Sequence, residues 1–557
     1  MRSPNDRLQS KLIQSASRVP SVRNRSGEAT GIGHQSLTNV VLLTLVFIGS
    51  PITAAAGEKP GTASEAVSPA TPATIGLEKI EPVETARKPR QYAGKVTIQG
   101  EEVRYRGRLA SATISRNDGA KSDKKATVFY TEYVRLGVAD KRGRPVTFCF
   151  NGGPGSASLW LHLGGLSPMR IELLPDELHP TDWELRPNVG SIIDQTDLVF
   201  IDPVSTGFSR PEKNDQKGEF HGYENDVASV SEFIRTWTAE NGRWASPQYI
   251  LGESYGGIRG VSVAQHLFSE HNYATEGLIL VSPVVDFQTI RFSESNDLPY
   301  AMFLPSYTAT AYHHNRINKA KYPTLADAMK AAEKFALGPY AAALLQGDRL
   351  PKKQRRRVVA QLAELTGLSE QYLQRADLRV TMSRFAKELL RDKNQIVGRF
   401  DGRFTSPAWD GNASGTEFDP SASFIAGAFT EAIQQHYYDS FRLRETKRYA
   451  ASGDVHPWDY SEFEGRYANA SNKLRETLVE QPNLRVLFCL GYTDLATPYM
   501  GSLHTISHLD VPASIREHIE TTFYDSGHMM YLRQSEQDRL KGDLDRFYNG
   551  EAARPRE

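Results

Sequence analysis

Four short, continuously apolar runs, separated by longer helical patterns, constrain the fold more than any other feature of the sequence. Strands that are buried on both faces of a parallel sheet read in this way. The runs are 146–150, 198–201, 278–281 and 484–490, and the strand-like segments 249–251 and 521–524 join them. Helical patterns such as 222–239 and 257–269 lie between them. The sequence therefore predicts an α/β fold with a mostly parallel central sheet and right-handed crossovers.

Two earlier segments show a different pattern. Residues 95–114 and 126–136 alternate β-branched or aromatic side chains with polar ones around a loop that contains Gly and Asp. This alternation is typical of half-buried antiparallel strands. We expect these segments to form one edge of the sheet.

The segment 249–257 runs from a predicted strand through Gly252-Glu253-Ser254-Tyr255-Gly256 directly into a helical pattern. This Gly-x-Ser-x-Gly arrangement is the nucleophile elbow of α/β-hydrolases, in which a strained turn projects the serine hydroxyl into a cleft. Glycines flank the serine because side chains there would collide with the following helix. The match is short and also occurs by chance, but the strand before it and the helix after it favour catalysis. Ser254 is therefore the predicted nucleophile.

A serine nucleophile needs a base and an orienting carboxylate. Asp494 follows the 484–490 strand, and His528 follows the final predicted strand. Ser, Asp, His is also the chain order of α/β-hydrolase triads. Asp525 is a competing orienter, but it lies only three residues before His528, so Asp494 is the favoured partner.

A glycine-rich loop, Asn151-Gly152-Gly153-Pro154-Gly155, follows the 146–150 strand. Consecutive glycines leave amide hydrogens exposed and allow a substrate carbonyl to approach closely. In isolation the loop would read as an ordinary tight turn. Beside a nucleophile elbow, it predicts the Gly153 and Tyr255 N–H groups as the two oxyanion donors.

Four separated motifs in this order carry a resemblance to the serine carboxypeptidases of peptidase family S10. They are 151–155, 202–209 (Asp-Pro-Val-Ser-Thr-Gly-Phe-Ser), 252–257, and the pair 491–498 with 527–529. The similarity extends roughly from Gln91 to Tyr548. It implies an α/β-hydrolase fold, the triad Ser254, Asp494 and His528, and Gly153 and Tyr255 as oxyanion donors.

The same resemblance implies that Asn151, the Gly152 amide and Glu253 bind the terminal carboxylate of a peptide substrate. An ionised glutamate would repel that carboxylate, whereas a protonated one donates a hydrogen bond to it. Burial raises the pKa of a carboxyl group and makes the protonated form accessible. The alternative is that Glu253 is a buried elbow carboxyl satisfied by the backbone.

Two positions depart from the family pattern. Gly165 stands where many members have a second glutamate that pairs with the one beside the serine. Ser156 stands where eukaryotic members have a disulfide cysteine, which fits a bacterial type of the family. Loss of the second acid leaves catalysis untouched, but it puts the strength and pH dependence of carboxylate recognition in question.

The stretch between 292 and 438 lacks buried-strand signals and carries helical patterns instead. Thr324 with Asp327 predicts a helix start, and Gly367 predicts a helix end. Helices inserted after a hydrolase strand generally cover the site, so we interpret 292–438 as a cap that shapes the substrate cleft. An independent interaction domain is the alternative. The core would then consist of 91–291 and 439–557.

The first 90 residues do not read as a folded domain. Residues 1–56 combine a long basic front, an apolar run at 40–48 and the small residues Ala54-Ala55-Ala56, which together predict a secretory signal peptide. The apolar run is short for a membrane span, which needs about 20 residues, so a permanent anchor is the less favoured alternative. Residues 57–90 are rich in Pro, Ala, Thr and Glu and predict a disordered linker. We expect export to the periplasm or the medium.

The amino-acid composition of the chain restricts the kinds of partner and cofactor that we expect. The chain of 557 residues carries 66 basic and 66 acidic side chains, so no nucleic-acid partner is expected. Cys149 and Cys489 are the only cysteines, and each lies in an apolar strand-like run, which favours buried thiols over a disulfide. No metal or other cofactor is expected, because the histidines of 266–271 and the pair His313-His314 lack zinc-binding spacing.

The favoured function is a secreted serine carboxypeptidase that acts on peptide substrates through an acyl-enzyme. Prolyl aminopeptidases and esterases can also carry Gly-Gly-Pro-Gly, but those aminopeptidases typically have His before the glycines and Trp after the serine, where this chain has Asn151 and Tyr255. An acyltransferase is a third possibility. A catalytically inactive binding protein is disfavoured, because all three triad residues are in place. The oligomeric state stays open.

Overall fold

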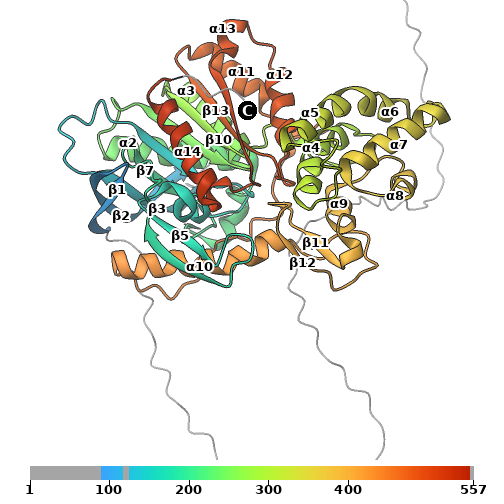
Figure 1. Ribbon diagram of the computed structural model, residues 1–557. Coiled ribbons are helices and arrows are strands. Elements are labelled where there is room, and N and C mark those ends of the chain that lie inside the picture. The colour runs from blue at the N-terminus through green and yellow to red at the C-terminus, as the bar shows by residue number, and fades with distance from the viewer. Residues whose placement is uncertain (1–88, 117–123, 552–557) are drawn as a thin grey trace, which may run out of the picture. The chain divides into compact units, whose positions relative to one another are not determined.

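The computed structural model describes residues 89–116 and 124–551, and a mixed sheet runs through the centre of this part of the chain (Figure 1). Its main strands follow the order β1-β2-β3-β7-β4-β9-β10-β13-β14, and the short β8 pairs with β3. The strands are β1 Arg90–Ile98, β2 Glu101–Arg116, β3 Lys124–Arg135, β4 Val146–Phe150, β7 Asp197–Ile201, β8 Arg210–Pro211, β9 Gln248–Glu253, β10 Gly277–Val281, β13 Arg485–Gly491 and β14 Ile519–Tyr524.

Neighbouring strands are parallel throughout one part of the sheet, which consists of β7, β4, β9, β10, β13 and β14 in that order. In register, Phe150 of β4 is opposite Gly252 of β9, and Val281 of β10 is opposite both Glu253 and Cys489. The carboxyl ends of these strands therefore meet at one edge, where open α/β sheets bind their ligands. The predicted fold class, an α/β-hydrolase arrangement with a mostly parallel sheet, is confirmed.

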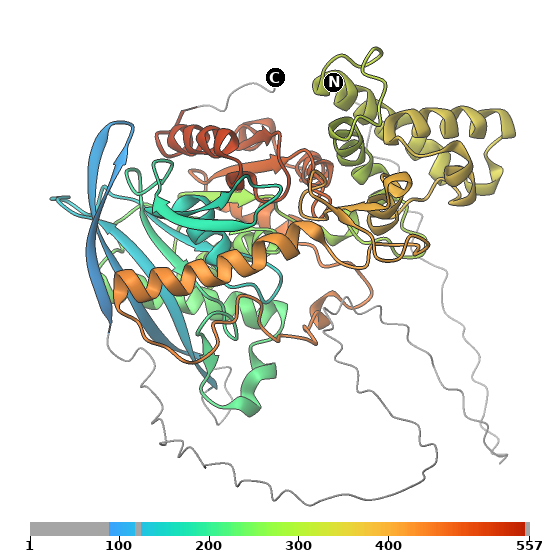
Figure 2. The same cartoon turned by 60° about the horizontal axis from the view of Figure 1, so that its bottom comes forward.

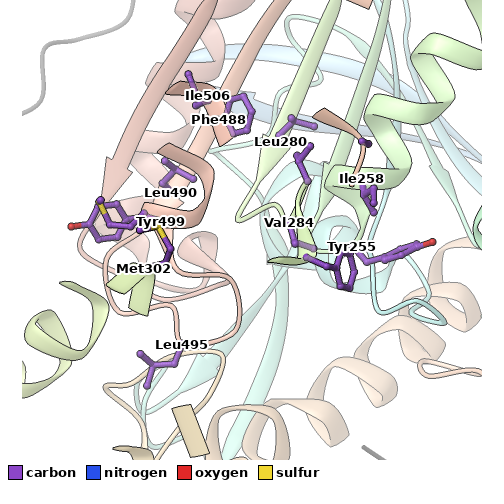
Figure 3. Packing of buried hydrophobic residues seen from close by; sticks show 14 of the residues in the cluster. Tyr255, Ile258, Leu280, Val284, Met302, Phe488, Leu490, Leu495, Tyr499 and Ile506 are labelled. Carbon is purple, nitrogen blue, oxygen red and sulfur yellow. The ribbon is translucent and has the colours of Figure 1, made fainter. Parts of the chain in front are cut away.

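Alternate residues of the central strands face two separate apolar cores, because successive side chains of a strand point to opposite faces. Phe148, Ile250, Leu280 and Phe488 belong to one core. Helices α2 (Tyr223–Glu240) and α3 (Gly256–His271) cover that face, and Figure 3 shows Ile258 of α3 beside Leu280. The opposite core holds the alternate strand residues together with α10 (Pro420–Phe441) and α14 (Gln534–Tyr548).

Both cysteines are buried and free, as the apolar runs around them predict. Cys149 belongs to β4 and Cys489 to β13, and neither side chain is exposed. They pack as small apolar side chains in the core that contains α10 and α14.

The antiparallel edge is present, with one difference from the expectation. Segment 95–114 is divided between β1 and β2 by a turn at Gln99 and Gly100, whose φ angles are 48° and 87°. The turn could not be predicted from the sequence, because the alternation continues on both sides of it. A second hairpin, β5 (Met169–Leu174) with β6 (Asp182–Pro187), was not expected at all.

The segment between β10 and β13 is mainly helical and includes a small hairpin. The capping box at Thr324 and Asp327 and the left-handed C-cap at Gly367 are both present, as predicted. Helix α10 runs along the core and contacts β1 and β6 (Figure 2). The elements are α4 Leu298–His313, α5 Leu325–Phe335, α6 Ala341–Gln346, α7 Lys352–Thr366, α8 Glu370–Arg375, α9 Met382–Glu388, β11 Gln395–Val397, β12 Thr405–Pro407, α10, and then α11 Ser471–Glu480.

Short helices complete the described chain: α1 Leu159–Leu161, α12 Tyr499–Ser507 and α13 Ala513–Arg516. Among the helices of the described residues, none has the length and apolar character that a membrane crossing requires. The signal peptide predicted at 1–56 and the linker predicted at 57–90 fall on residues before 89, apart from the last two linker positions, and so lie outside the described part.

Candidate active site

Ser254 occupies a tight turn between β9 and α3. Its φ angle of 63° lies in the left-handed region, which is rare for a residue with a side chain and marks a strained turn. The backbone holds it there: Ser254 N–H donates to Val281 O at 3.0 Å, and Ser254 O accepts from Gly257 N–H at 2.9 Å and Val284 N–H at 3.1 Å. The serine itself is half-buried. The turn is thus pinned to β10 and its following loop.

Glycines surround this turn for a steric reason. A Cβ atom at Gly252 would lie 2.1 Å from the carbonyl oxygen of Gly256, and one at Gly257 would lie 2.4 Å from Pro283 Cβ. No side chain fits at either distance. The predicted collision with the following helix is present at Gly252. At Gly256 a Cβ atom would lie 3.1 Å from Phe150 O, a tight contact rather than a collision, and at Gly257 the collision is with Pro283, outside the helix.

Asp494 and His528 meet at the same sheet edge, in the loops after β13 and β14. His528 Nδ1 lies 2.7 Å from Asp494 Oδ2, and both side chains are about 1% exposed. Thr497 Oγ1 lies 2.8 Å from Asp494 Oδ2 and donates to Ser282 O, which ties the pair to the residue after β10. Asp525, the competing orienter, instead faces Arg533 at 3.4 Å.

The buried pair changes the protonation of His528. Burial opposes the charged imidazolium, but the charge of Asp494 and its hydrogen bond outweigh burial and raise the pKa of His528 above its ordinary value. Glu253, next to the serine, also favours the imidazolium. Within the described residues, the Ser254 hydroxyl makes no hydrogen bond of its own.

A turn from the segment between β11 and β12, Phe400–Arg403, holds both loops. Phe400 O accepts from His528 N–H at 2.6 Å, and Gly402 N–H donates to Thr493 O at 2.9 Å. The buried Asp401 carboxylate accepts from Thr493 Oγ1 at 2.8 Å and from Gly527 N–H at 3.1 Å. Sequence reasoning missed this turn, because its contacts are with residues about 90 to 130 positions away.

Arg403 completes the turn by pairing with Asp401 at 2.6 Å. Burial raises the pKa of Asp401, but the Arg403 charge and hydrogen bonds more than compensate, so the pKa lies below its ordinary value. The Arg403 guanidinium also donates to Ser526 Oγ at 3.1 Å, two residues before His528. The Asp401–Arg403 ion pair thus holds the loop that carries His528 in place.

The glycine loop after β4 lies against the elbow. A Cβ atom at Gly152 would lie 2.4 Å from Tyr255 N, so only glycine leaves the space in front of that amide open. Gly153 has a φ of 102°, which glycine adopts without strain. In the turns and loops of the described residues, neither Gly153 N–H nor Tyr255 N–H donates to a backbone carbonyl. Both amides are thus available to a ligand.

A buried ion pair fixes the loop to the helices. Arg259 of α3 pairs with Asp226 of α2 at 2.6 Å and donates to Asn151 O at 2.5 Å. Its guanidinium lies over the rings of Phe150 and Tyr255, at 5.4 and 5.2 Å from their centroids. This arginine was not identified from the sequence, where it reads as one more helical residue.

Glu253 and Asn151 lie beside each other beneath the elbow. Glu253 is 2% exposed, and burial raises its pKa to about 7, against smaller lowering effects of His528, Tyr531 and Asn151. Tyr531 Oη donates to Glu253 Oε2 at 2.6 Å. Asn151 Oδ1 accepts from Leu161 N–H at 3.1 Å. Its Nδ2 is buried and, among the described residues, makes no hydrogen bond of normal geometry, although the amide lies close enough to favour the ionised form of Glu253.

An unsatisfied buried amide costs free energy unless a ligand supplies an acceptor. The site therefore offers two groups suited to a carboxylate: the Asn151 amide and a glutamate that is easily protonated. Across residues 89–116 and 124–551, no three His, Cys, Asp or Glu side chains are grouped so that they could hold a metal ion.

Comparisons with known proteins give the following. Residues 119–541 match the model of the peptidase S10 family, described as serine carboxypeptidase. No curated protein matches the sequence. Among solved structures, the chain is similar to Kex1(delta)p, a prohormone-processing carboxypeptidase from Saccharomyces cerevisiae, with 15% identity, a TM-score of 0.45, and coverage of 83% of this chain and 91% of that one. It is also similar to a proline iminopeptidase from Mycobacterium smegmatis, with 14% identity, a TM-score of 0.33, and coverage of 79% and 98%.

Proposed function

The chain belongs to the peptidase S10 family of serine carboxypeptidases, and from this premise we propose that it removes C-terminal residues from peptides through an acyl-enzyme, with Ser254, His528 and Asp494 as its triad. The observation that carries the proposal is the buried 2.7 Å contact between His528 and Asp494 at the sheet edge where the elbow presents Ser254.

The geometry supports the following sequence of steps. Ser254 Oγ attacks the scissile carbonyl carbon while His528 Nε2 takes the hydroxyl proton, since Asp494 occupies Nδ1. The Gly153 and Tyr255 N–H groups donate to the oxyanion of the tetrahedral intermediate. As the intermediate collapses, His528 passes its proton to the nitrogen of the leaving C-terminal residue. Water then attacks the acyl-enzyme, with His528 acting again as base.

Recognition of the substrate's terminal carboxylate falls to Asn151, the Gly152 amide and Glu253. The unpartnered Asn151 Nδ2 donates to it, and protonated Glu253 adds a second hydrogen bond. Because the pKa of Glu253 is about 7, the glutamate is largely protonated in mildly acidic solution. Hydrolysis of free-acid peptides needs protonated Glu253 and neutral His528, so the rate should follow a bell-shaped pH profile whose limbs belong to the coupled pair.

Mass spectrometry of one peptide offered in two forms tests this function. The peptide with a free C-terminus should lose residues one at a time from that end at about pH 5, and the same peptide with a C-terminal amide should be cut far more slowly. The Ser254→Ala protein should trim neither. Internal cleavage, or equal loss from both forms, would replace carboxypeptidase by endopeptidase or esterase as the function.

We also propose that the protein is exported. The apolar run at 40–48 and Ala54-Ala55-Ala56 support this, and their composition suits a signal peptide better than any folded element. N-terminal sequencing of the protein recovered from periplasm or medium should give a start close to Gly57. A soluble cytoplasmic protein that retains Met1 would overturn the proposal.

A further inference from the structure

Tyr531 fills the space above two consecutive glycines of the segment after α1. A Cβ atom at Gly164 would lie 2.3 Å from a Tyr531 ring carbon, and one at Gly165 would lie 2.6 Å from Tyr531 Cβ. Tyr531 therefore occupies the volume that a side chain at position 165 would need. The two glycines and the tyrosine form one steric unit, although 366 positions separate 165 from 531.

The Tyr531 hydroxyl reaches from this position to the residue before the elbow serine. Its 2.6 Å contact with Glu253 Oε2 is buried on both sides, and Tyr531 itself has no exposed surface. Tyr531 thus holds one carboxyl oxygen of Glu253, and the Asn151 amide is the other neutral donor close to this carboxyl group.

We propose that Tyr531 is a positioning residue for Glu253: its hydroxyl fixes one carboxyl oxygen, so that the other carries the proton donated to the substrate's terminal carboxylate. The inference rests on the proposed carboxypeptidase function and deepens it. Gly165 leaves Glu253 without a second acid as its partner, and Tyr531 supplies a neutral donor in that place.

A phenol partner has a different consequence from an acid partner. A second carboxylic acid could share a proton with Glu253, whereas Tyr531 keeps its own proton, because burial raises the pKa of its hydroxyl well above the ordinary value. A donor to a carboxylate favours the ionised form. The other charged groups that act on Glu253 are His528, which also favours ionisation, and Asp494, which opposes it. Removing the Tyr531 hydroxyl should therefore make Glu253 harder to ionise.

The test compares full-length wild type and Tyr531→Phe on three N-blocked substrates: a dipeptide with a free carboxylate, its amide, and a matching methyl ester. The ratio of kcat/KM for acid over amide is measured from pH 4 to 8. In wild type this ratio should fall near neutral pH. In Tyr531→Phe we expect the ratio at pH 5 to drop several-fold, because the carboxyl is no longer oriented, and the midpoint of its fall to move to higher pH.

Two further variants separate positioning from packing. Tyr524→Phe removes another buried phenol that donates to a carboxylate, Asp543 at 2.8 Å, and should leave the midpoint where it is in wild type. Glu253→Gln cannot ionise, so in that background Tyr531→Phe should no longer move any midpoint. If Tyr531→Phe unfolds, Gly165→Ala gives a second route, since its Cβ would lie 2.6 Å from Tyr531 Cβ and would force the tyrosine to move.

The outcomes are distinct. A wild-type profile that depends on pH together with an identical profile in Tyr531→Phe would overturn the role of Tyr531 and leave the function standing. An equal shift in Tyr524→Phe would also overturn it, because the effect would then be general. Equal rates for acid and amide in wild type at every pH would instead refute carboxylate recognition itself.

Discussion

Ser254 and Ser205 share a positive φ angle, and they differ in the residues around them. Both serines have a positive φ, 63° and 73°. Ser205 Oγ lies 2.8 Å from His221 Nε2, whereas the Ser254 hydroxyl makes no hydrogen bond among the described residues. Strain and a nearby histidine therefore do not by themselves distinguish an active serine from a structural one.

His528 and His221 differ in whether a carboxylate forms a hydrogen bond with the imidazole ring. Asp494 backs His528, and its charge and hydrogen bond raise the pKa of that histidine despite burial. In the described residues no carboxylate bonds to His221, and burial followed by the charge of Lys217 lowers its pKa. The serine side differs too: Glu253 precedes Ser254, whereas the apolar Val204 precedes Ser205. Under the proposed function, the carboxylate bonded to His528 is what distinguishes Ser254 from Ser205.

The largest expected effect separates the two serines directly. Ser254→Ala should lower kcat by a factor on the order of 10⁵, since loss of a triad nucleophile leaves only binding and the oxyanion donors. Ser205→Ala removes a hydroxyl from an equivalent local geometry and should change kcat by less than about twofold. Steady-state kinetics on one peptide measures both, and comparable losses would mean that the two serines have been distinguished wrongly.

Asp494→Asn should give the next largest effect. The amide keeps the volume but holds the wrong tautomer of His528, which is expected to cost kcat about 10⁴-fold. Because the Asp494 charge helps to hold the pKa of His528 up, the acidic limb of the pH profile should also move to lower pH in the residual activity. Asp454→Asn removes a charge that acts on His221 instead; it serves as the control and should leave the profile in place. An unchanged limb in Asp494→Asn would contradict the assigned electrostatics.

Asp401→Ala tests whether the Phe400–Arg403 turn positions the Asp494 and His528 loops. Removing one partner of a buried ion pair leaves Arg403 uncompensated and should cost about 3 to 5 kcal/mol of stability. Loosened loops should lower kcat about 10-fold to 100-fold with little change in KM. Urea unfolding and kinetics measure the two losses. Replacing Asp401 and Arg403 together by Leu and Met should restore stability more than kcat, and equal recovery of both would point to a purely structural brace.

Glu253→Gln should have the smallest effect, seen in the pH dependence of stability. The pKa of Glu253 is raised in the folded state to about 7. Protonated Glu253 therefore contributes its full stabilisation of the folded state below the ordinary carboxyl pKa. This contribution is lost as the pH rises through about 7, and the loss is on the order of 3 kcal/mol. Glutamine does not titrate, so the variant should lose less stability between pH 4.5 and 8 in urea unfolding. Parallel curves for the two proteins would rule out a raised pKa.

The sequence predicted those parts of the site that a local pattern encodes. The elbow, the glycine loop and the two loops after β13 and β14 each follow a strand directly, so their common edge followed from the parallel sheet. Tyr531, Asp401 and Arg259 were missed, because each acts on a residue more than 90 positions away. The turn at Gln99 was missed for another reason, since polar alternation alone does not reveal where one strand ends.

Labelling with a fluorophosphonate, followed by peptide mapping, tests the central claim most directly. The reagent reacts with a serine only where a base and oxyanion donors act on it together. The account predicts one phosphonyl group per chain, located on Ser254, with labelling abolished in Ser254→Ala and slowed strongly in Asp494→Asn. A label on Ser205, or no label on a folded protein that trims peptides, would contradict it.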